Sequence, residues 1–148
     1  MYKKILVPLD GSTRAELILP HVEQLAFQNT ARVVFIRVVK PIFVTDGYQT
    51  ITVDASLALN DELIDEANKY LKKIAGEFKE KGIDTKVVVK SGSVAEIIVG
   101  LARQEKADLI AMASHGRTGL SRVFYGSVAA GVLHQVDRPL LLIRSRQA

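Results

Sequence analysis

Short apolar runs alternate along the chain with longer stretches in which apolar residues recur at helical spacing. The runs are apolar at nearly every position rather than at every second one, a pattern typical of strands buried on both faces. The sequence therefore predicts an α/β fold with a parallel sheet that helices cover on both sides. The predicted strands cover residues Lys3 to Pro8, Ala31 to Val39, Thr85 to Lys90, Ala107 to Ala113 and 139–144.

Four helices are predicted between or after these strands. Capping boxes mark the starts of two of them, Thr13 with Glu16 and Ser93 with Glu96. In the longest helix the apolar positions share one face, and Gly82 follows its last turn. The predicted helices run from the turn at residues 10–13 to about Asn29, from Leu59 to Lys81, from residue 93 to about Glu105, and from Ser127 to Val136.

Right-handed crossovers and a chain of 148 residues leave few possible strand orders. We expect a single domain over residues 1–148, built as an open, doubly wound, Rossmann-like sheet of five parallel strands in the order 3-2-1-4-5. Strands one and four would then be neighbours where the winding reverses, which is where such sheets bind ligands. The turns at Leu9 to Ser12 and at Ala113 to Ser127 would face each other across that crevice.

Composition and charge narrow the functional classes. Hydrophobic residues make up 48% and charged residues 24%, and cysteine is absent, so disulfides and thiolate chemistry are excluded. No apolar run approaches the roughly 20 residues of a membrane span, and we expect a cytoplasmic protein without a membrane partner. The net charge of +4 comes from basic residues interleaved with acidic ones, such as Asp65 with Lys69, so no nucleic acid partner is expected.

The segment between the fourth strand and the last helix carries the strongest functional signal. Residues 114–129 read SHGRTGLSRVFYGSVA and place glycines on a strand-to-helix turn, a layout typical of phosphate binding by backbone amides. Each glycine alone is more often an ordinary turn residue, and Ser127 could be a plain N-cap, but their combination favours a phosphate site. Arg117 and Arg122 could neutralise phosphate oxygens or simply face solvent.

Asp10, directly after the first strand, is the candidate partner of this loop. Its carboxylate could accept hydrogen bonds from ribose hydroxyls, or it could form an Asx turn that stabilises the bend, and the two roles are compatible. Walker and dinucleotide-binding signatures are absent. The histidines lack metal-ligand spacing and Ser12 has no catalytic partner in any motif, so the residues favour binding over catalysis.

Three ordered motifs span the chain: ILVPLDGS near the start, ASHGRTGL followed by GS, and RPLLLI near the end. Together they resemble the universal stress protein family over the whole chain. The nucleotide-binding pattern of that family, G-x2-G-x9-G-[ST], falls here on Ala113, Gly116, Gly126 and Ser127. An alanine forced to a positive φ would cost about 1 to 2 kcal/mol, but because Ala113 ends an apolar strand we expect an extended conformation and little cost.

The resemblance implies a homodimer that binds ATP and pairs through its C-terminal strand at residues 139–144. Pro8, Leu9 and Asp10 would meet the adenosine, and Val38 would line the adenine pocket. Arg37 departs from the family, which often has a histidine there. The residues implied to contact the nucleotide are Pro8, Leu9, Asp10, Ser12, Val38, Met112, Ala113, Ser114, His115, Gly116, Arg117, Thr118, Gly119, Gly126, Ser127 and Val128.

Three functions therefore remain open. The leading one is a stress-response or regulatory protein that binds ATP, with Mg²⁺ held through the phosphates. The second is slow ATP hydrolysis or phosphoryl transfer in the same crevice, for which no general base is evident. The third is a nucleotide-free dimerisation module, supported by the apolar last strand at a sheet edge. The connection from Lys40 to Ala58 could close over a ligand as a lid, could be a binding loop, or could be mobile.

Overall fold

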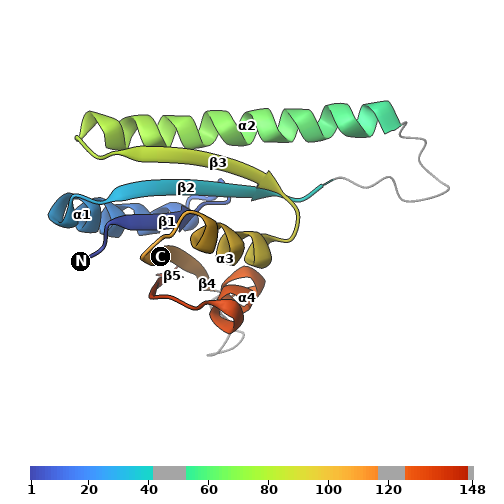
Figure 1. Ribbon diagram of the computed structural model, residues 1–148. Coiled ribbons are helices and arrows are strands. Elements are labelled where there is room, and N and C mark those ends of the chain that lie inside the picture. Colours follow the sequence, from blue (N-terminus) through green and yellow to red (C-terminus); the bar gives the residue numbers. More distant parts are fainter. Residues whose placement is uncertain (42–52, 117–125, 147–148) are drawn as a thin grey trace.

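Five parallel strands form one sheet in the order β3-β2-β1-β4-β5 (Figure 1). The computed structural model describes residues 1–41, 53–116 and 126–146. The predicted fold class and strand order are confirmed. The strands are β1 (Lys4–Pro8), β2 (Arg32–Val39), β3 (Thr85–Ser91), β4 (Leu109–Gly116) and β5 (Leu140–Arg146), and the helices are a 3-10 turn, η1 (Ala15–Ile18), then α1 (Leu19–Asn29), α2 (Val53–Glu80), α3 (Val94–Gln104) and α4 (Ser127–Gln135).

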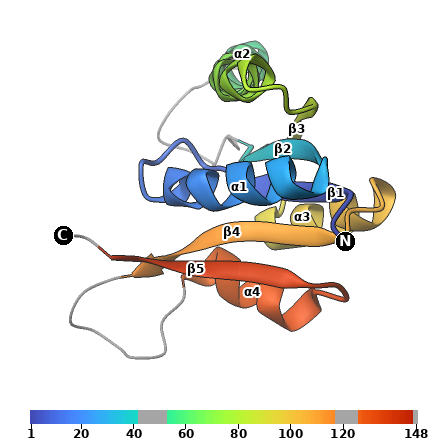
Figure 2. The same ribbon diagram turned by 90° about the vertical axis from the view of Figure 1, so that its left-hand side faces the viewer.

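Helices cover both faces of the sheet, with α1 and α2 on one face and α3 and α4 on the other (Figure 2). Alternate residues of β2 point into two hydrophobic cores, one on each face of the sheet. Phe35 packs under α2, where its ring meets that of Phe78 edge-on with centroids 5.1 Å apart. Ile36 and Val34 pack on the other side with residues of α3 and α4. Because both faces are buried, the strands read as nearly continuous apolar runs.

The longest helix begins earlier than its sequence pattern suggests. α2 starts at Val53, so the prediction of a connection reaching Ala58 was wrong. The exposed side chains of Leu57 and Leu59 explain the error, because they give this first stretch no one-sided apolar pattern. Residues 42–52, on which most of the predicted lid falls, lie outside the described residues. At the other end, Gly82 has φ +83° and closes the helix as expected.

The helix starts differ from the predicted capping boxes. Thr13 does not cap the first helix. Instead Ser12 Oγ accepts a hydrogen bond from the Ala15 amide at 3.1 Å, and η1 precedes α1. Ser93 is the N-cap of α3, as predicted, but its side chain makes no capping hydrogen bond. In the described parts of the chain, no helix has both the length and the apolar character needed to cross a membrane.

Candidate functional site

A cavity of about 390 Å³ opens at the carboxyl ends of the strands, where β1 lies beside β4 and the winding reverses. Its volume falls within the range of roughly 300 to 1,000 Å³ that is typical of small-ligand sites. The first predicted turn and the start of the last helix meet here. The lining residues are Pro8, Leu9, Asp10, Ala15, Ile36, Val38, Lys40, Val94, Ile98, Met112, Ala113, Ser127, Val128 and Ala129.

The turn after β1 is held by local hydrogen bonds. Asp10 Oδ1 accepts a hydrogen bond from the Ser12 amide at 2.9 Å, so the Asx turn is confirmed. Gly11 between them has φ +87°, a conformation that favours glycine. The Leu9 amide donates to the Ile36 carbonyl at 2.9 Å and ties the start of the turn to β2. The Asp10 carboxylate therefore sits on an ordered turn at the cavity wall.

Beside this turn lies a small pocket of about 30 Å³, large enough for about one water molecule. It brings Ser12 and Ser114 next to Asp10 and Ala113. Ser114 is buried and its Oγ donates to the Ile143 carbonyl at 3.4 Å, so this hydroxyl ties β4 to β5.

Ala113 lies near the end of β4, and its strand pairing shows its backbone conformation. It pairs with Ile143 of β5 in the parallel register. Among the described residues other than glycine, only Thr30 and Lys106 have a positive φ, so Ala113 lies in the extended strand as predicted. The alanine in place of the first glycine of the motif therefore carries no backbone strain here.

The last helix begins behind a glycine with a special backbone conformation. Gly126 has φ +85° and ψ 151°, a region essentially restricted to glycine. It is the N-cap of α4, so the interpretation of Ser127 as the N-cap was wrong: Ser127 is the first helical residue. The Ala130 amide donates to the Gly126 carbonyl at 3.0 Å, and the amides of the first turn before it have no acceptor within the helix. Those donors, with the positive end of the helix dipole, favour an anion at this point.

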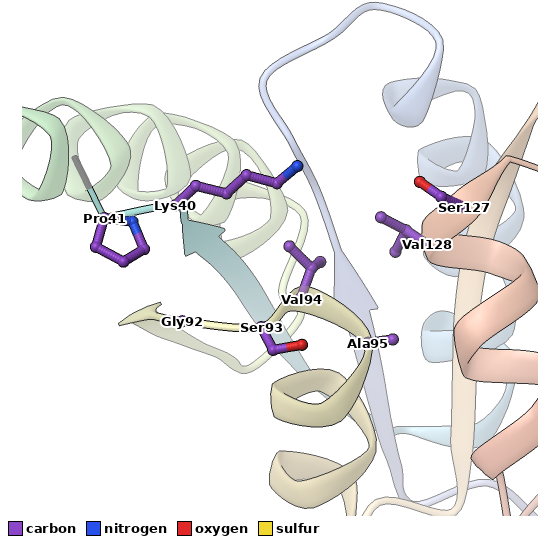
Figure 3. Close-up of a pocket in the computed structure, with 8 residues that line it drawn as sticks. All are labelled: Lys40, Pro41, Gly92, Ser93, Val94, Ala95, Ser127 and Val128. Carbon is purple, nitrogen blue, oxygen red and sulfur yellow. The ribbon is translucent and has the colours of Figure 1, made fainter. Parts of the chain in front are cut away.

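A second hollow of about 560 Å³ adjoins the cavity and shares with it Lys40, Val94, Ser127 and Val128 (Figure 3). The first turns of α3 and α4 stand on opposite sides of it, and Lys40 reaches from the end of β2 toward the side of Ser127 (Figure 3). Two helix N-termini and a lysine make this part of the site favourable for negative charge.

The structure brings together most of the predicted site residues that it describes. Pro8, Leu9, Asp10, Val38, Met112, Ala113, Ser127 and Val128 line the cavity, and Ser12 and Ser114 line the small pocket. His115 and Gly116 form the end of β4, and Gly126 caps α4. Arg117, Thr118 and Gly119 lie outside the described residues.

Sequence reasoning missed six residues of the cavity wall. Ile36 lies two positions before Val38 on the same face of β2, and Val94 and Ile98 are one helical turn apart on α3, so the predicted topology contained the signal for these three. Lys40 and Ala129 lie at the ends of two segments that the sequence singled out, residues 40–58 and 114–129, but neither was assigned to the nucleotide, and nothing in the sequence distinguished Ala15. The missed residues are Ala15, Ile36, Lys40, Val94, Ile98 and Ala129.

Comparison with known proteins identifies the family. A model of the universal stress protein family matches residues 1–144. The chain belongs to this family. Universal stress protein MJ0577 of Methanocaldococcus jannaschii is 30% identical over 159 residues, which cover 100% of this chain and 98% of that protein. The solved structure of hypothetical protein MJ0577 superposes with a TM-score of 0.83 at 31% identity, covering 100% of this chain and 99% of that one.

Two further universal stress protein structures share the fold. One, from Archaeoglobus fulgidus in complex with dAMP, has a TM-score of 0.67 at 20% identity and covers 96% of this chain and 98% of that chain. The other, in complex with cAMP, has a TM-score of 0.64 at 22% identity and covers 98% of each chain. Because both identities are below 25%, these two structures show only that the fold is shared.

Proposed function

We propose that this universal stress protein is a stress-response or regulatory protein that binds an adenine nucleotide, ATP, at the carboxyl ends of β1 and β4. The observation that carries the proposal is the cavity itself, where the ordered Asp10 turn faces the N-terminus of α4 behind Gly126. Solved relatives in complex with dAMP and cAMP support an adenine nucleotide as the ligand.

The two ends of the cavity suit the two ends of a nucleotide. Val38, Met112 and Val128 supply apolar surface for a base, and the Asp10 carboxylate could accept hydrogen bonds from ribose hydroxyls. The first-turn amides of α4 and the nearby Lys40 suit phosphate oxygens. Among the described residues no three histidine, aspartate or glutamate side chains gather as a metal site, so the proposal assigns Mg²⁺ to the phosphates.

Titration calorimetry on nucleotide-stripped protein tests the proposal, with ATP compared against AMP and cAMP. We expect saturable heat with ATP, weakened by Asp10→Asn, and unchanged by Asp65→Asn, a matched control on the exposed face of α2. Protein purified without stripping should also release adenine absorbance on denaturation. The proposal would be contradicted if millimolar ATP gave no heat of binding and did not compete with AMP or cAMP. That result would favour a nucleotide-free dimerisation module.

We further propose that the protein forms a homodimer through the strand at residues 139–144. β5 stands last in the sheet order, and the side chains of Leu140 to Ile143 are only partly buried. An apolar edge strand of this kind invites pairing with a second copy. Sedimentation should give a dimer for the wild type and a monomer for Leu142→Lys, while Phe27→Lys on the exposed surface of α1 should leave the dimer intact. A monomeric wild type would rule the dimer out.

A further inference from the structure

Arg37 lies on the side of the sheet opposite the cavity. Its neighbours in β2, Ile36 and Val38, line the cavity, and strand alternation sends Arg37 toward the face covered by α1 and α2. The side chain is half-buried there and contacts two elements: the turn after β1 and the middle of α2. Arg37 therefore joins the wall of the candidate site to the longest helix.

The first contact is with Gly11, between Asp10 and Ser12. A Cβ built on Gly11 would lie 3.1, 3.2 and 3.3 Å from Nη1, Cζ and Nη2 of Arg37. Three such similar distances mean that the flat face of the guanidinium covers the place where a side chain would stand. Glycine is favoured at position 11 by its φ of +87°, and a side chain there would also displace the guanidinium by a few tenths of an ångström.

The second contact is with Tyr70 of α2. Arg37 Cζ lies 5.4 Å from the centre of the Tyr70 ring, within the range of a cation–π interaction. The Tyr70 hydroxyl is buried and lies near the Glu16 carboxylate. Burial, followed by the negative charge of Glu16, raises the pKa of Tyr70 above its usual value, so the phenol stays neutral. Arg37 therefore contacts the ring of Tyr70 rather than its hydroxyl.

We propose that Arg37, supported by the Tyr70 ring, is a positioning residue that holds the Asp10 to Ser12 turn in the shape required for ligand binding. The turn is short and contains a glycine, which loses more conformational freedom on ordering than other residues. A guanidinium packed against Gly11 and held by the Tyr70 ring restricts the turn before the ligand arrives. The inference has two arms. The turn arm, that Arg37 orders the turn, is independent of the proposed function, whereas the ligand arm, that this order strengthens ligand binding, rests on it.

The turn arm is tested on the ligand-free protein by NMR relaxation of the Gly11 and Ser12 amides. Arg37→Met keeps the aliphatic stem and removes the guanidinium, so the order parameters should fall from about 0.85 toward about 0.6. Tyr70→Leu should act in the same direction, whereas Tyr70→Phe should change nothing because the ring is retained. Lys72→Met, at an exposed position of α2, is the matched control. Unchanged order parameters in a folded Arg37→Met protein would overturn the proposal.

The ligand arm is a double-mutant cycle on the Kd for ATP. Arg37→Met should raise Kd about tenfold in the wild type but less than about twofold in the Asp10→Asn background, because Arg37 acts through Asp10. Equal factors in both backgrounds would overturn the positioning role. If Arg37→Met does not fold, Arg37→Lys, which keeps the charge but lacks the flat face, should show the same loss of order. A wild type that binds no nucleotide refutes the proposed function, and the relaxation data still decide the role of Arg37.

Discussion

Ala95 of α3 leaves no room for a side chain on Gly131 of α4. A Cβ built on Gly131 would lie 2.7 Å from the Ala95 Cβ, closer than two such carbons can approach. The first half of α3 therefore packs almost against the backbone of α4. Because Val94 and Val128 of the same two helices line both hollows of the candidate site, this contact sets the distance across it.

Gly131→Ala should push the two helices apart. We expect a loss of about 1 to 3 kcal/mol in the free energy of unfolding, the usual cost of an extra methyl group in a tight contact, together with weaker ATP binding. Denaturant titration and calorimetry measure the two effects. Gly100→Ala in α3 is the matched control: a Cβ there meets nothing within 4 Å, so the helix should gain up to about 1 kcal/mol.

The pair also allows a rescue. Ala95→Gly removes the methyl group that Gly131→Ala would strike, so the double variant should recover most of the ATP affinity lost by Gly131→Ala. Recovery of affinity in the double variant identifies the contact as the cause. If the two substitutions simply add, the loss comes from elsewhere in α4.

Alanine substitutions at Gly126 and Gly82 distinguish the effect of backbone strain on stability from an effect on ligand binding. Both have nearly the same positive φ, +85° and +83°, but only Gly126 stands at the N-terminus of α4 beside the cavity. Each substitution by alanine should cost about 1 to 3 kcal/mol of stability. Only Gly126→Ala should also weaken ATP binding, because it displaces the first-turn amides. Equal ATP affinities for the two variants, measured by calorimetry, would mean that the phosphates of ATP do not bind at the N-terminus of α4.

Ala113 provides a test in the opposite direction. Since it is extended and paired with Ile143, restoring the glycine of the family motif by Ala113→Gly should leave the Kd for ATP within about twofold. Stability should fall by roughly 0.5 to 1 kcal/mol because glycine is more flexible when unfolded. A tenfold gain in affinity on calorimetric titration would show that the bound state needs a conformation that alanine resists.

The strands and their order could be predicted because burial on both faces leaves a direct trace in the sequence. Phe35 and Ile36 are adjacent, face opposite cores, and are both apolar for that reason. The start of α2 leaves no such trace: Leu57 and Leu59 are exposed, so the helix there is set by propensity and by chain geometry rather than by burial.

The candidate site divides in the same way. Motif spacing and topology identified Asp10, Ala113 and Ser127, whose positions follow from the ends of β1 and β4. Arg37 was noticed only as a departure from the family, since its contact with Gly11 depends on a side chain crossing to a neighbouring turn. The choice of Gly126 over Ser127 as the N-cap was also hidden, because a serine before a helix normally predicts the cap.

Glu105 makes stability depend on pH at the end of the sheet remote from the cavity. Its largely buried carboxylate accepts a hydrogen bond from Lys86 Nζ at 2.5 Å, and Lys4 Nζ lies 3.9 Å away. The Lys86 hydrogen bond lowers the pKa of Glu105 below its usual value of 4.5, although burial opposes this. A lowered pKa in the folded state stabilises the protein above the unfolded-state pKa, and this contribution is lost as the pH falls through the folded-state value.

Glu105→Gln should therefore lower the free energy of unfolding at neutral pH by up to about 1 kcal/mol, because solvent at the half-exposed Lys86 screens the pair. The difference from wild type should stay constant down to about pH 5 and shrink below the usual pKa of 4.5, as the wild-type carboxylate becomes protonated. Urea titrations across this range measure it. Glu23→Gln, which breaks the exposed pair of Glu23 with Lys81 at 2.9 Å, is the control and should change stability by less than about 0.5 kcal/mol. A difference for Glu105→Gln that grows as the pH falls would mean that burial outweighs the two lysines.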